Sequence, residues 1–285
     1  MSAVEGKGTK IARVTFVYPI VTLAALVMLF PLLWTLSTSL KTLENVTMRE
    51  LRLVPDPVAW WNYVELFEIV PVSLYLRNTM VVVVPAILGG LLVCSLAAYA
   101  FARISFPGRA ALFAFLLSTM MLPGMVRLVP LFIVFDRLGW SNSFLPLVVP
   151  RLLGHNPFYI FLLIQFFRGI PEELLDAARL DGCSEVGTWW RIVMPNSKPV
   201  LAAVAIFAFQ FAWNDFLHPL IYLGGNRDLW TLALGLNALK GFEGMQTSFH
   251  YMMAMSVLMT APMLAVFAVG QKYMVQGVTL SGVQG

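Results

Sequence analysis

The chain has 285 residues, of which 59% are hydrophobic and only 12% are charged. Soluble globular domains carry about 45–50% apolar and about 25% charged residues, so this composition excludes a water-soluble fold and indicates a protein whose solvent is the lipid bilayer. The formal net charge of +4 is small and spread along the chain, which argues against a nucleic-acid partner. In a membrane protein such basic residues are typical of the cytoplasmic flanks of the spans.

Residues 1–15 are predicted to be a polar tail that precedes the first membrane span. Lys7 and Lys10 lie in this tail, and an apolar run follows from Phe16 to Thr38. The apolar region of a signal peptide is about 7–15 residues long and ends at a small-residue cleavage site. This run is longer and no such site follows it. We therefore expect a transmembrane helix that is retained.

Six apolar segments are long enough to cross the hydrocarbon core, which requires about 20 helical residues. Strands are excluded because an open sheet would leave backbone groups unpaired in lipid, and the strict alternation of a barrel is missing. The predicted fold is an all-α integral membrane protein with six transmembrane helices. They lie near Phe16–Thr38, Thr79–Ala102, Ala110–Phe135, Ser143–Phe167, Pro199–Tyr222 and Tyr251–Tyr273.

Three polar segments separate these spans. Residues 41–76 are predicted to be a long loop, whose tryptophans suit a membrane interface. Residues 168–198 are the most polar continuous stretch, and the glycine-rich residues 224–250 predict a loop with short helical pieces. With both termini inside, the basic residues divide into roughly ten inside and nine outside, so the positive-inside rule does not decide the orientation.

Residues 170–199, between the fourth and fifth spans, predict a short helix–turn–helix outside the membrane. Pro171 suits the start of a helix, and Glu172 and Glu173 fall in its first turn, where the helix dipole favours anions. Gly182 can take the left-handed conformation that ends this helix.

A second short helix follows within the same stretch. Ser184 can cap its N-terminus, and Val186, Trp190 and Val193 are predicted to line one side before Pro195 ends it. An element of this size has no core of its own. We therefore expect its apolar face to be buried against lipid headgroups or another protein.

This stretch resembles the EAA loop of ABC-importer permeases, which reads Glu-Ala-Ala, three residues, Gly, nine residues and Ile-x-Leu-Pro. Here Asp176-Ala177-Ala178, Gly182 and Ile192-Val193-Met194-Pro195 stand at the matching spacing, with Asp for Glu and Met for Leu. In that family the loop forms the coupling helix, which seats in a groove on the ATPase subunit. The resemblance implies these ATPase-coupling residues: Glu173, Leu174, Asp176, Ala177, Ala178, Asp181, Gly182, Ile192 and Pro195.

Other stretches resemble the carbohydrate branch of the family, specifically the smaller permease of the maltose-type heterodimer. They are residues 97–109, 121–142, 157–171, Trp213–Phe216 and 275–285. The resemblance implies import of a sugar or oligosaccharide by alternating access across the bacterial cytoplasmic (inner) membrane. A maltose-like disaccharide, a longer oligosaccharide and glycerol 3-phosphate or a related polyol all remain open as substrates.

The resemblance also implies the partners and the organisation of the chain. The partners are a second homologous permease, two ATPase subunits that bind ATP and magnesium, an extracytoplasmic sugar-binding protein and membrane lipid. This chain would bind no cofactor. Residues 16–275 would form the permease domain, flanked by cytoplasmic tails at 1–15 and 276–285. The C-terminal tail residues Ser281, Gly282 and Gln284 would reach toward the ATPase.

Other classes of function fit the sequence less well. No phosphate-binding loop or His-Glu-x-x-His motif occurs, and the histidines stand alone, so neither ATP binding nor a metal site is predicted. An ion-coupled secondary transporter should carry several membrane-central carboxylates or an inverted repeat, and neither is evident. Cys94 and Cys183 are predicted to be reduced, because one lies in a span and the other in a loop.

Three polar residues within the spans are candidates for lining a transport pathway. Arg127 follows Pro123-Gly124, where a helix could be interrupted, and an ionisable residue inside a membrane is a functional candidate by default. Arg127 could instead extend to the interface or pair with Asp136. For Asn214 and Asp215, helix capping or an interhelical hydrogen bond is the alternative to a substrate contact.

Overall fold

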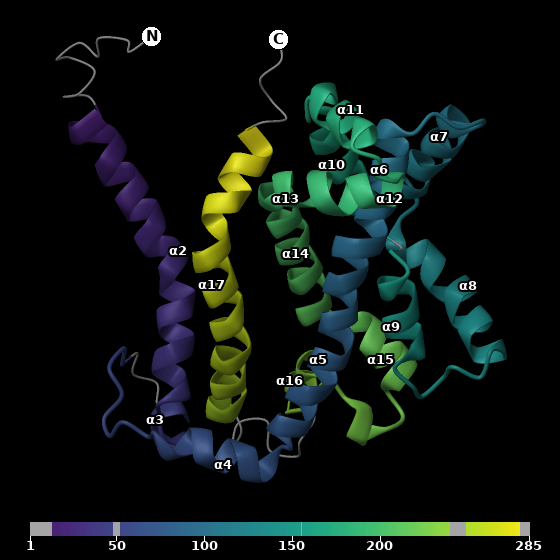
Figure 1. Ribbon diagram of the computed structural model, residues 1–285. Helices are drawn as coiled ribbons and strands as arrows, with labels where there is room; N and C mark the ends of the chain where they lie inside the picture. Colours follow the sequence, from purple (N-terminus) through teal and green to yellow (C-terminus); the bar gives the residue numbers. More distant parts are fainter. Residues whose placement is uncertain (1–12, 48–51, 155, 240–248, 280–285) are drawn as a thin grey trace. The chain divides into compact units, whose positions relative to one another are not determined.

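The computed structural model describes residues 13–47, 52–154, 156–239 and 249–279, and every regular element within these ranges is helical (Figure 1). The α-helices are α2 (Tyr18–Ser39), α3 (Leu43–Thr47), α4 (Trp61–Ile69), α5 (Val72–Leu88), α6 (Ser95–Arg103), α7 (Arg109–Met120), α8 (Gly124–Arg137), α9 (Leu145–Leu152), α10 (Pro157–Arg168), α11 (Glu172–Leu180), α12 (Glu185–Thr188), α13 (Met194–Asn196), α14 (Lys198–Trp213), α15 (Leu217–Leu223), α16 (Leu232–Ala238) and α17 (Phe249–Thr279). Three π-helical turns, η1 (Arg13–Val17), η2 (Gly89–Cys94) and η3 (Trp189–Val193), and one 3-10 turn, η4 (Arg227–Leu229), join some of them.

The helices that can cross a membrane follow the predicted order. Four helical runs are long and apolar enough by themselves: Thr15–Ser39, Val72–Arg103, Leu145–Arg168 and Phe249–Lys272. Two bent pairs pass the same test together: Arg109–Met120 with Gly124–Arg137, and Glu185–Asn196 with Lys198–Trp213. With each bent pair counted as one span, the described residues contain six, and the predicted all-α membrane fold is confirmed.

The second span begins at Val72 rather than at Thr79, so the predicted first loop is too long at its C-terminal end. Hydropathy did not indicate that the span begins before Thr79, because several residues near the start of α5 are polar. Asn78 is fully buried, and its Nδ2 donates hydrogen bonds to the carbonyl oxygens of Asp228 (2.8 Å) and Trp230 (3.0 Å). A buried amide whose NH2 group is bonded in this way can be accommodated inside the helical bundle.

The third span is broken where Pro123-Gly124 indicated an interruption. Helices α7 and α8 meet there at a bend of 101°. Pro123 has an extended backbone (φ −56°, ψ 134°), and it cannot donate the backbone hydrogen bond that would continue α7. The segment from Arg109 to Arg137 is therefore two helices joined by a corner.

The fifth span does not run to Tyr222 as predicted, because α14 ends at Trp213 and α15 begins only at Leu217. Asp215 lies in the gap, and its Oδ1 accepts a hydrogen bond from the backbone N–H of His218 (3.3 Å). A short acidic side chain that satisfies a free N–H group favours a new helix start over continuation of the preceding helix.

Two compact units make up the chain, and the first consists of residues 1–70 and 236–260. Within it, the buried amide of Asn62 on α4 donates to the carbonyl oxygens of Ser39 (2.9 Å) and Lys41 (2.8 Å). The hydroxyl of Tyr251 on α17 donates to Glu65 on α4 (2.6 Å). Helix α4 is thus fixed by hydrogen bonds to the end of α2 and to the start of α17.

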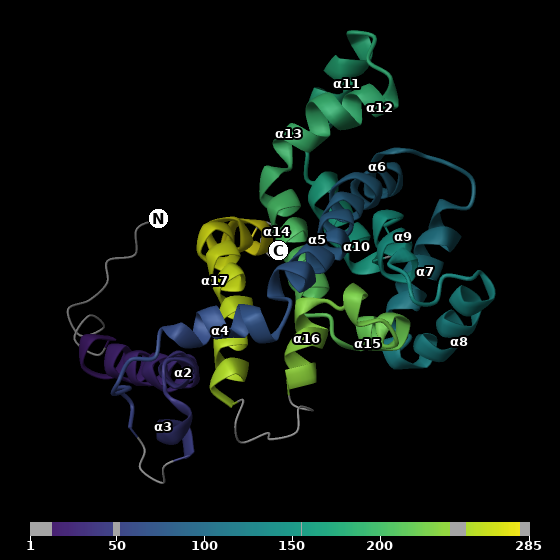
Figure 2. The ribbon, with the colours of Figure 1, turned by 90° about the horizontal axis from the view of Figure 1, so that it is seen from below.

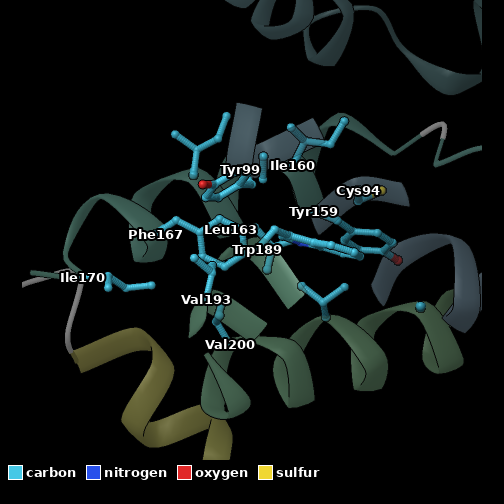
Figure 3. Packing of buried hydrophobic residues seen from close by; sticks show 14 of the residues in the cluster. Cys94, Tyr99, Tyr159, Ile160, Leu163, Phe167, Ile170, Trp189, Val193 and Val200 are labelled. Atoms are coloured by element: carbon cyan, nitrogen blue, oxygen red, sulfur yellow. The ribbon is translucent and has the colours of Figure 1, made fainter. Parts of the chain in front are cut away.

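The second unit, residues 71–235 and 261–285, contains the largest buried core. Helices α6 and α10 pack side by side, as do α5 and α14. Figure 3 shows the centre of this core, where aromatic and branched side chains from α6, α10, η3 and α14 meet: Tyr99, Leu163, Phe167, Trp189, Val193 and Val200. All helices of the site described below belong to this unit.

Gly89 marks a close approach between two helical segments of this unit. A Cβ atom on Gly89 would lie 1.9 Å from the carbonyl oxygen of Arg151 and 2.8 Å from that of Leu152. The backbone at the end of α9 therefore rests directly on η2, and only glycine leaves room for it.

Gly89→Ala is expected to destabilise the protein by about 1–3 kcal/mol, because the extra methyl group forces the two backbones apart. The measurement is the thermal unfolding midpoint of the detergent-solubilised protein. Gly124→Ala is the matched control, because a Cβ on Gly124 meets nothing within 4 Å. An unchanged midpoint for Gly89→Ala would show that the packing at this point is loose.

Candidate functional site

The helix–turn–helix element, defined as residues 170–199, extends away from α10 and α14 (Figure 2). Its first helix, α11, begins after Pro171 with Glu172 and Glu173 in the first turn, as predicted. The second part is a continuous helical run from Glu185 to Asn196 that includes the π-helical turn η3. Pro195 lies inside this run, so the prediction that it ends the helix was wrong.

The turn between the two parts has the geometry predicted from Gly182. This glycine has a left-handed backbone with φ 80°. The backbone N–H of Cys183 donates to the carbonyl oxygen of Ala178 (2.9 Å), and that of Gly182 donates to Arg179 (3.0 Å). This pair of bonds is a Schellman motif, which satisfies the last carbonyl groups of α11.

The second helix is capped by Ser184, as predicted. Its Oγ accepts a hydrogen bond from the backbone N–H of Gly187 (3.2 Å). The backbone of Ser184 is extended, which is the usual conformation of an N-cap residue. Both ends of the turn are therefore held by interactions within residues 178–187.

The inner face of the element packs on the core of its own chain. Leu175 and Val193 have no exposed surface, and Trp189 is 7% exposed. They contact a core that includes Tyr99 on α6 and Phe167 on α10 (Figure 3). The prediction that the apolar face is buried against lipid headgroups or another protein was therefore wrong for this inner face, which packs on α6 and α10 of its own chain.

The prediction that Val186, Trp190 and Val193 share one face was wrong. Val193 is buried, whereas Val186 is 60% and Trp190 is 56% exposed. The π-helical turn Trp189–Val193 has a wider turn than the α-helical period on which the prediction relied. Trp189, rather than Trp190, is thereby turned toward the core.

Two side chains of α6 attach the element to the membrane helices. The guanidinium group of Arg103 donates to the carbonyl oxygens of Phe167 and Ile170 and pairs with Glu172 (2.6 Å). The hydroxyl of Tyr99 donates to Glu185. Sequence reasoning gave neither residue a role, although both lie in the matched stretch 97–109.

Arg179 ties the two helices of the element together on the exposed side. Its guanidinium group contacts Asp176 (3.0 Å), Glu185 (3.4 Å) and Glu172 (3.5 Å). The hydrogen bond to Asp176 is the main cause that raises the pKa of Arg179. These groups are solvated, so each pair contributes little to stability and serves mainly to fix the relative orientation of the helices.

The predicted coupling residues fall into three groups by burial. Ala178 is buried and Ile192 is half-buried, so both belong to the inner side. The exposed members are Glu173, Leu174, Asp176, Ala177, Asp181, Gly182 and Pro195. The C-terminal tail residues Ser281, Gly282 and Gln284 lie outside the described residues.

Four large apolar side chains of the element remain exposed, and we call them together the outer apolar face. They are Leu174 (45% exposed), Leu180 (89%), Val186 (60%) and Trp190 (56%). Large apolar side chains that stay exposed on one element are candidates for an interaction site. Acidic side chains of the same element, including Asp176, lie close to it in the sequence.

The pathway candidates occupy different environments. Arg127 is exposed on α8, and Asp136 does not pair with it but accepts a hydrogen bond from Ser141 (2.6 Å). Asn214 is exposed and donates to the carbonyl oxygen of Gln210 (3.1 Å), which is a capping role at the end of α14.

Asp215, in contrast, is buried in a cluster of charged groups. Its side chain is 9% exposed and forms an ion pair with Arg151 of α9, whose side chain is 14% exposed. Its Oδ1 lies 2.9 Å from Nδ1 of His218. The structure thus brings Asp215 together with two residues that sequence reasoning did not connect to it, and no local spacing could have revealed the contact with Arg151.

Comparison with known proteins gives one family and one fold. Residues 86–280 match the family described as binding-protein-dependent transport system inner membrane component. The arabinooligosaccharide transport permease AraQ of Bacillus subtilis is 33% identical over 266 residues, which cover 92% of each chain. The trehalose/maltose transport permease MalG of Thermococcus litoralis is 31% identical over 265 residues, covering 92% of this chain and 94% of that protein.

A solved structure has the same fold along almost the whole chain. It is a bacterial ABC transporter involved in the import of the acidic polysaccharide alginate, and its superposition gives a TM-score of 0.82 at 20% sequence identity. The match covers 95% of this chain and 99% of that one. At this level of identity the likeness concerns the fold alone.

Proposed function

Because the chain belongs to the inner membrane components of binding-protein-dependent transport systems, we propose that it carries a saccharide across the membrane as one subunit of an ATP-driven importer. The chain is a multi-pass membrane protein and a transport subunit, not an enzyme. The solute would be received from an extracytoplasmic binding protein and released into the cytoplasm. Energy would come from ATP and magnesium bound by two separate ATPase subunits.

The observation that carries this proposal is the outer apolar face of the helix–turn–helix element. Nothing in the described part of the second unit covers it: Leu180 is 89% exposed, and Val186 and Trp190 are more than half exposed. An ATPase subunit with an apolar groove would bury this face. The residues predicted for coupling lie on the same element. Five of them are exposed: Glu173, Asp176, Ala177, Asp181 and Gly182.

The proposed mechanism is alternating access. Closure of the two ATPase subunits on ATP would move the helix–turn–helix element and, through Arg103 and Tyr99, the membrane helices packed on it. A second homologous permease would supply the other half of the path. The proposal places the element and both tails, residues 1–15 and 276–285, in the cytoplasm, with residues 16–275 as the permease domain.

The class of solute is proposed from the relatives. AraQ and MalG are named for arabinooligosaccharides and for trehalose and maltose, and a diacetylchitobiose uptake permease of Streptomyces coelicolor is 30% identical over 87% of this chain. These solutes share neutral, polyhydroxylated pyranose or furanose rings. A sulfoquinovosyl glycerol permease of Agrobacterium fabrum is also 31% identical over 90% of this chain. A saccharide or glycoside is therefore the proposed cargo, rather than glycerol 3-phosphate.

The test is uptake by proteoliposomes that contain the chain with its partner permease and ATPase, supplied with the binding protein. We expect ATP-dependent uptake of at least one of arabinotriose, diacetylchitobiose, maltose or trehalose, and none of glycerol 3-phosphate. The purified chain alone, as the control, should hydrolyse no ATP. Uptake driven by an ion gradient without the ATPase would contradict the proposal and support a secondary transporter.

A further inference from the structure

A cluster of three polar side chains joins α9 to the start of α15 in the second unit, and we call its members, Arg151, Asp215 and His218, the polar cluster. Arg151 lies in the last turn of α9, Asp215 between α14 and α15, and His218 in the first turn of α15. Asp215 is the hub. It binds Arg151 through Oδ2, and the ring and the backbone N–H of His218 through Oδ1.

Helical segments end beside the polar cluster at two places. Helix α9 ends at Leu152 and α10 begins at Pro157, while α14, the last part of the fifth span, ends at Trp213 and α15 begins at Leu217. Non-helical backbone in a membrane protein is tolerated where it is buried in protein or lines a water-filled cavity. Transporters bind their substrates at such breaks, where free backbone groups and polar side chains can meet the solute.

His218 is the member of the polar cluster that a solute can reach. Its side chain is 49% exposed, against 9% for Asp215 and 14% for Arg151. A carboxylate paired with a guanidinium group accepts hydrogen bonds, so Nδ1 of His218 is the nitrogen that carries the proton donated to Asp215. The other ring nitrogen, Nε2, is then fixed in orientation and turned away from the carboxylate.

The His218 ring lies against two further aromatic rings, of which Tyr222 is buried (3% exposed) and Phe132 is 37% exposed. The ring is stacked on Tyr222 at 6.5 Å with an interplanar angle of 19°, and Tyr222 is stacked on Phe132 of α8 at 6.2 Å and 18°. Small-molecule sites combine such apolar aromatic faces with a few precisely oriented polar groups. A sugar presents the complementary chemistry, because its C–H faces pack on rings and its hydroxyl groups hydrogen-bond to an imidazole.

We propose that His218 contacts the hydroxyl groups of the transported saccharide and that Asp215 and Arg151 are positioning residues that orient its ring. This inference rests on the proposed function for the identity of the cargo. The location of the contact does not rest on the proposed function, because it is argued from the exposure of His218 and from the helix ends beside it.

The first test measures access of water to His218 in the assembled complex. His218→Cys and Leu220→Cys are made in a Cys183→Ser background, while Cys94 is 1% exposed. Leu220 is 40% exposed on the same helix, and two residues along a helix turn it about 200° away. The probe is the charged, membrane-impermeant reagent methanethiosulfonate ethylsulfonate, which reacts with thiolates in water and not with thiols in lipid.

The thiol at position 218 is expected to react at least about tenfold faster than the thiol at 220, since thiolate formation requires a hydrated site. Its rate should also differ between the nucleotide-free and the vanadate-trapped complex. Equal rates at both positions would overturn the inference, and that result would leave the proposed function intact.

The second test separates contact from structure. His218→Leu is expected to raise the half-saturation concentration for arabinotriose, or for whichever sugar of the uptake panel is transported, by about tenfold, with the maximal rate of ATP hydrolysis retained. His218→Gln, which keeps a hydrogen-bonding group, should restore part of the affinity. An unchanged half-saturation concentration in His218→Leu would overturn the contact while uptake by the wild type upheld the proposed function.

The positioning role is tested by the double variant Arg151→Met/Asp215→Leu, which removes both charges and leaves neither one buried alone. It is expected to raise the same half-saturation concentration, and adding His218→Leu should cause no further rise, because both changes act through one ring. Additive effects would show that Arg151 and Asp215 do not act through His218. If no sugar of the panel is transported, the thiol measurement still decides the inference.

Discussion

Leu174→Asp and Leu180→Asp, each made in the complete importer, are expected to weaken the binding of the ATPase subunits by at least about tenfold. Truncating or charging a side chain at the centre of an interface costs about 2 kcal/mol or more, and a carboxylate that loses its water without a partner adds to this cost. Both leucines lie on the outer apolar face, with 45% and 89% of their surface exposed. The fold should therefore be unaffected.

The measurement is the amount of ATPase that copurifies with the tagged chain, together with sugar uptake and the thermal unfolding midpoint. Leu53→Asp is the matched control, because Leu53 is 56% exposed but lies between α3 and α4. It should bind the ATPase as the wild type does. Full ATPase binding and full uptake in both test variants would show that the helix–turn–helix element is not the coupling site.

Arg103→Ala is expected to separate ATP hydrolysis from transport. Its guanidinium group donates to the carbonyl oxygens of Phe167 and Ile170, two residues with almost no exposed surface. The carbonyl oxygen of Phe167 keeps a hydrogen bond from the backbone N–H of Ile170 (3.2 Å), so the main loss is at the carbonyl oxygen of Ile170, where a buried acceptor left without a donor costs about 1–3 kcal/mol. The junction between α10 and the element should loosen by a corresponding amount, so that movement of the element no longer reaches the membrane helices.

Uptake by Arg103→Ala should accordingly fall by at least about tenfold, which corresponds to 1.4 kcal/mol of lost coupling, while the bound ATPase still hydrolyses ATP. Arg109→Ala is the control, because Arg109, at the start of α7, makes one long hydrogen bond to the carbonyl oxygen of Ile104 (3.3 Å). Glu172→Gln tests the exposed ion pair alone and should have a small effect. Loss of uptake in Arg109→Ala to the same extent would assign the effect to charge rather than to the junction.

Local features of the element could be predicted from the sequence because nearby residues determine them. Gly182 and Ser184 hold the turn through hydrogen bonds that span at most five residues. Which side of the second helix packs on the core could not be predicted. The π-helical turn at Trp189–Val193 changes the helical period from which buried positions are inferred. That turn is stabilised by packing on α6 and α10, which sequence spacing does not contain.

For polar residues inside the spans too, local roles could be predicted from the sequence and distant contacts could not. The sequence identified Asp215 as a candidate for the pathway, but its ion-pair partner Arg151 is 64 residues away. Likewise Tyr99 and Glu185 are 86 residues apart. Contacts of this range depend on which helices become neighbours. For the same reason Asn78, a polar residue whose NH2 group is bonded by a segment 150 residues later, concealed the true start of the second span.

The Schellman turn and the cap at Ser184 let the helix–turn–helix element form locally, on helices that are synthesised before it. Most of the inner face of the element rests on α6 and α10, both of which precede it in the chain, whereas only Val200, Val204 and Ala208 of the buried cluster follow it. A chain that is made from its N-terminus therefore has this platform in the membrane before residues 172–196 leave the ribosome. The turn then forms from its own residues, and the element can settle on the platform while α14 is still being made.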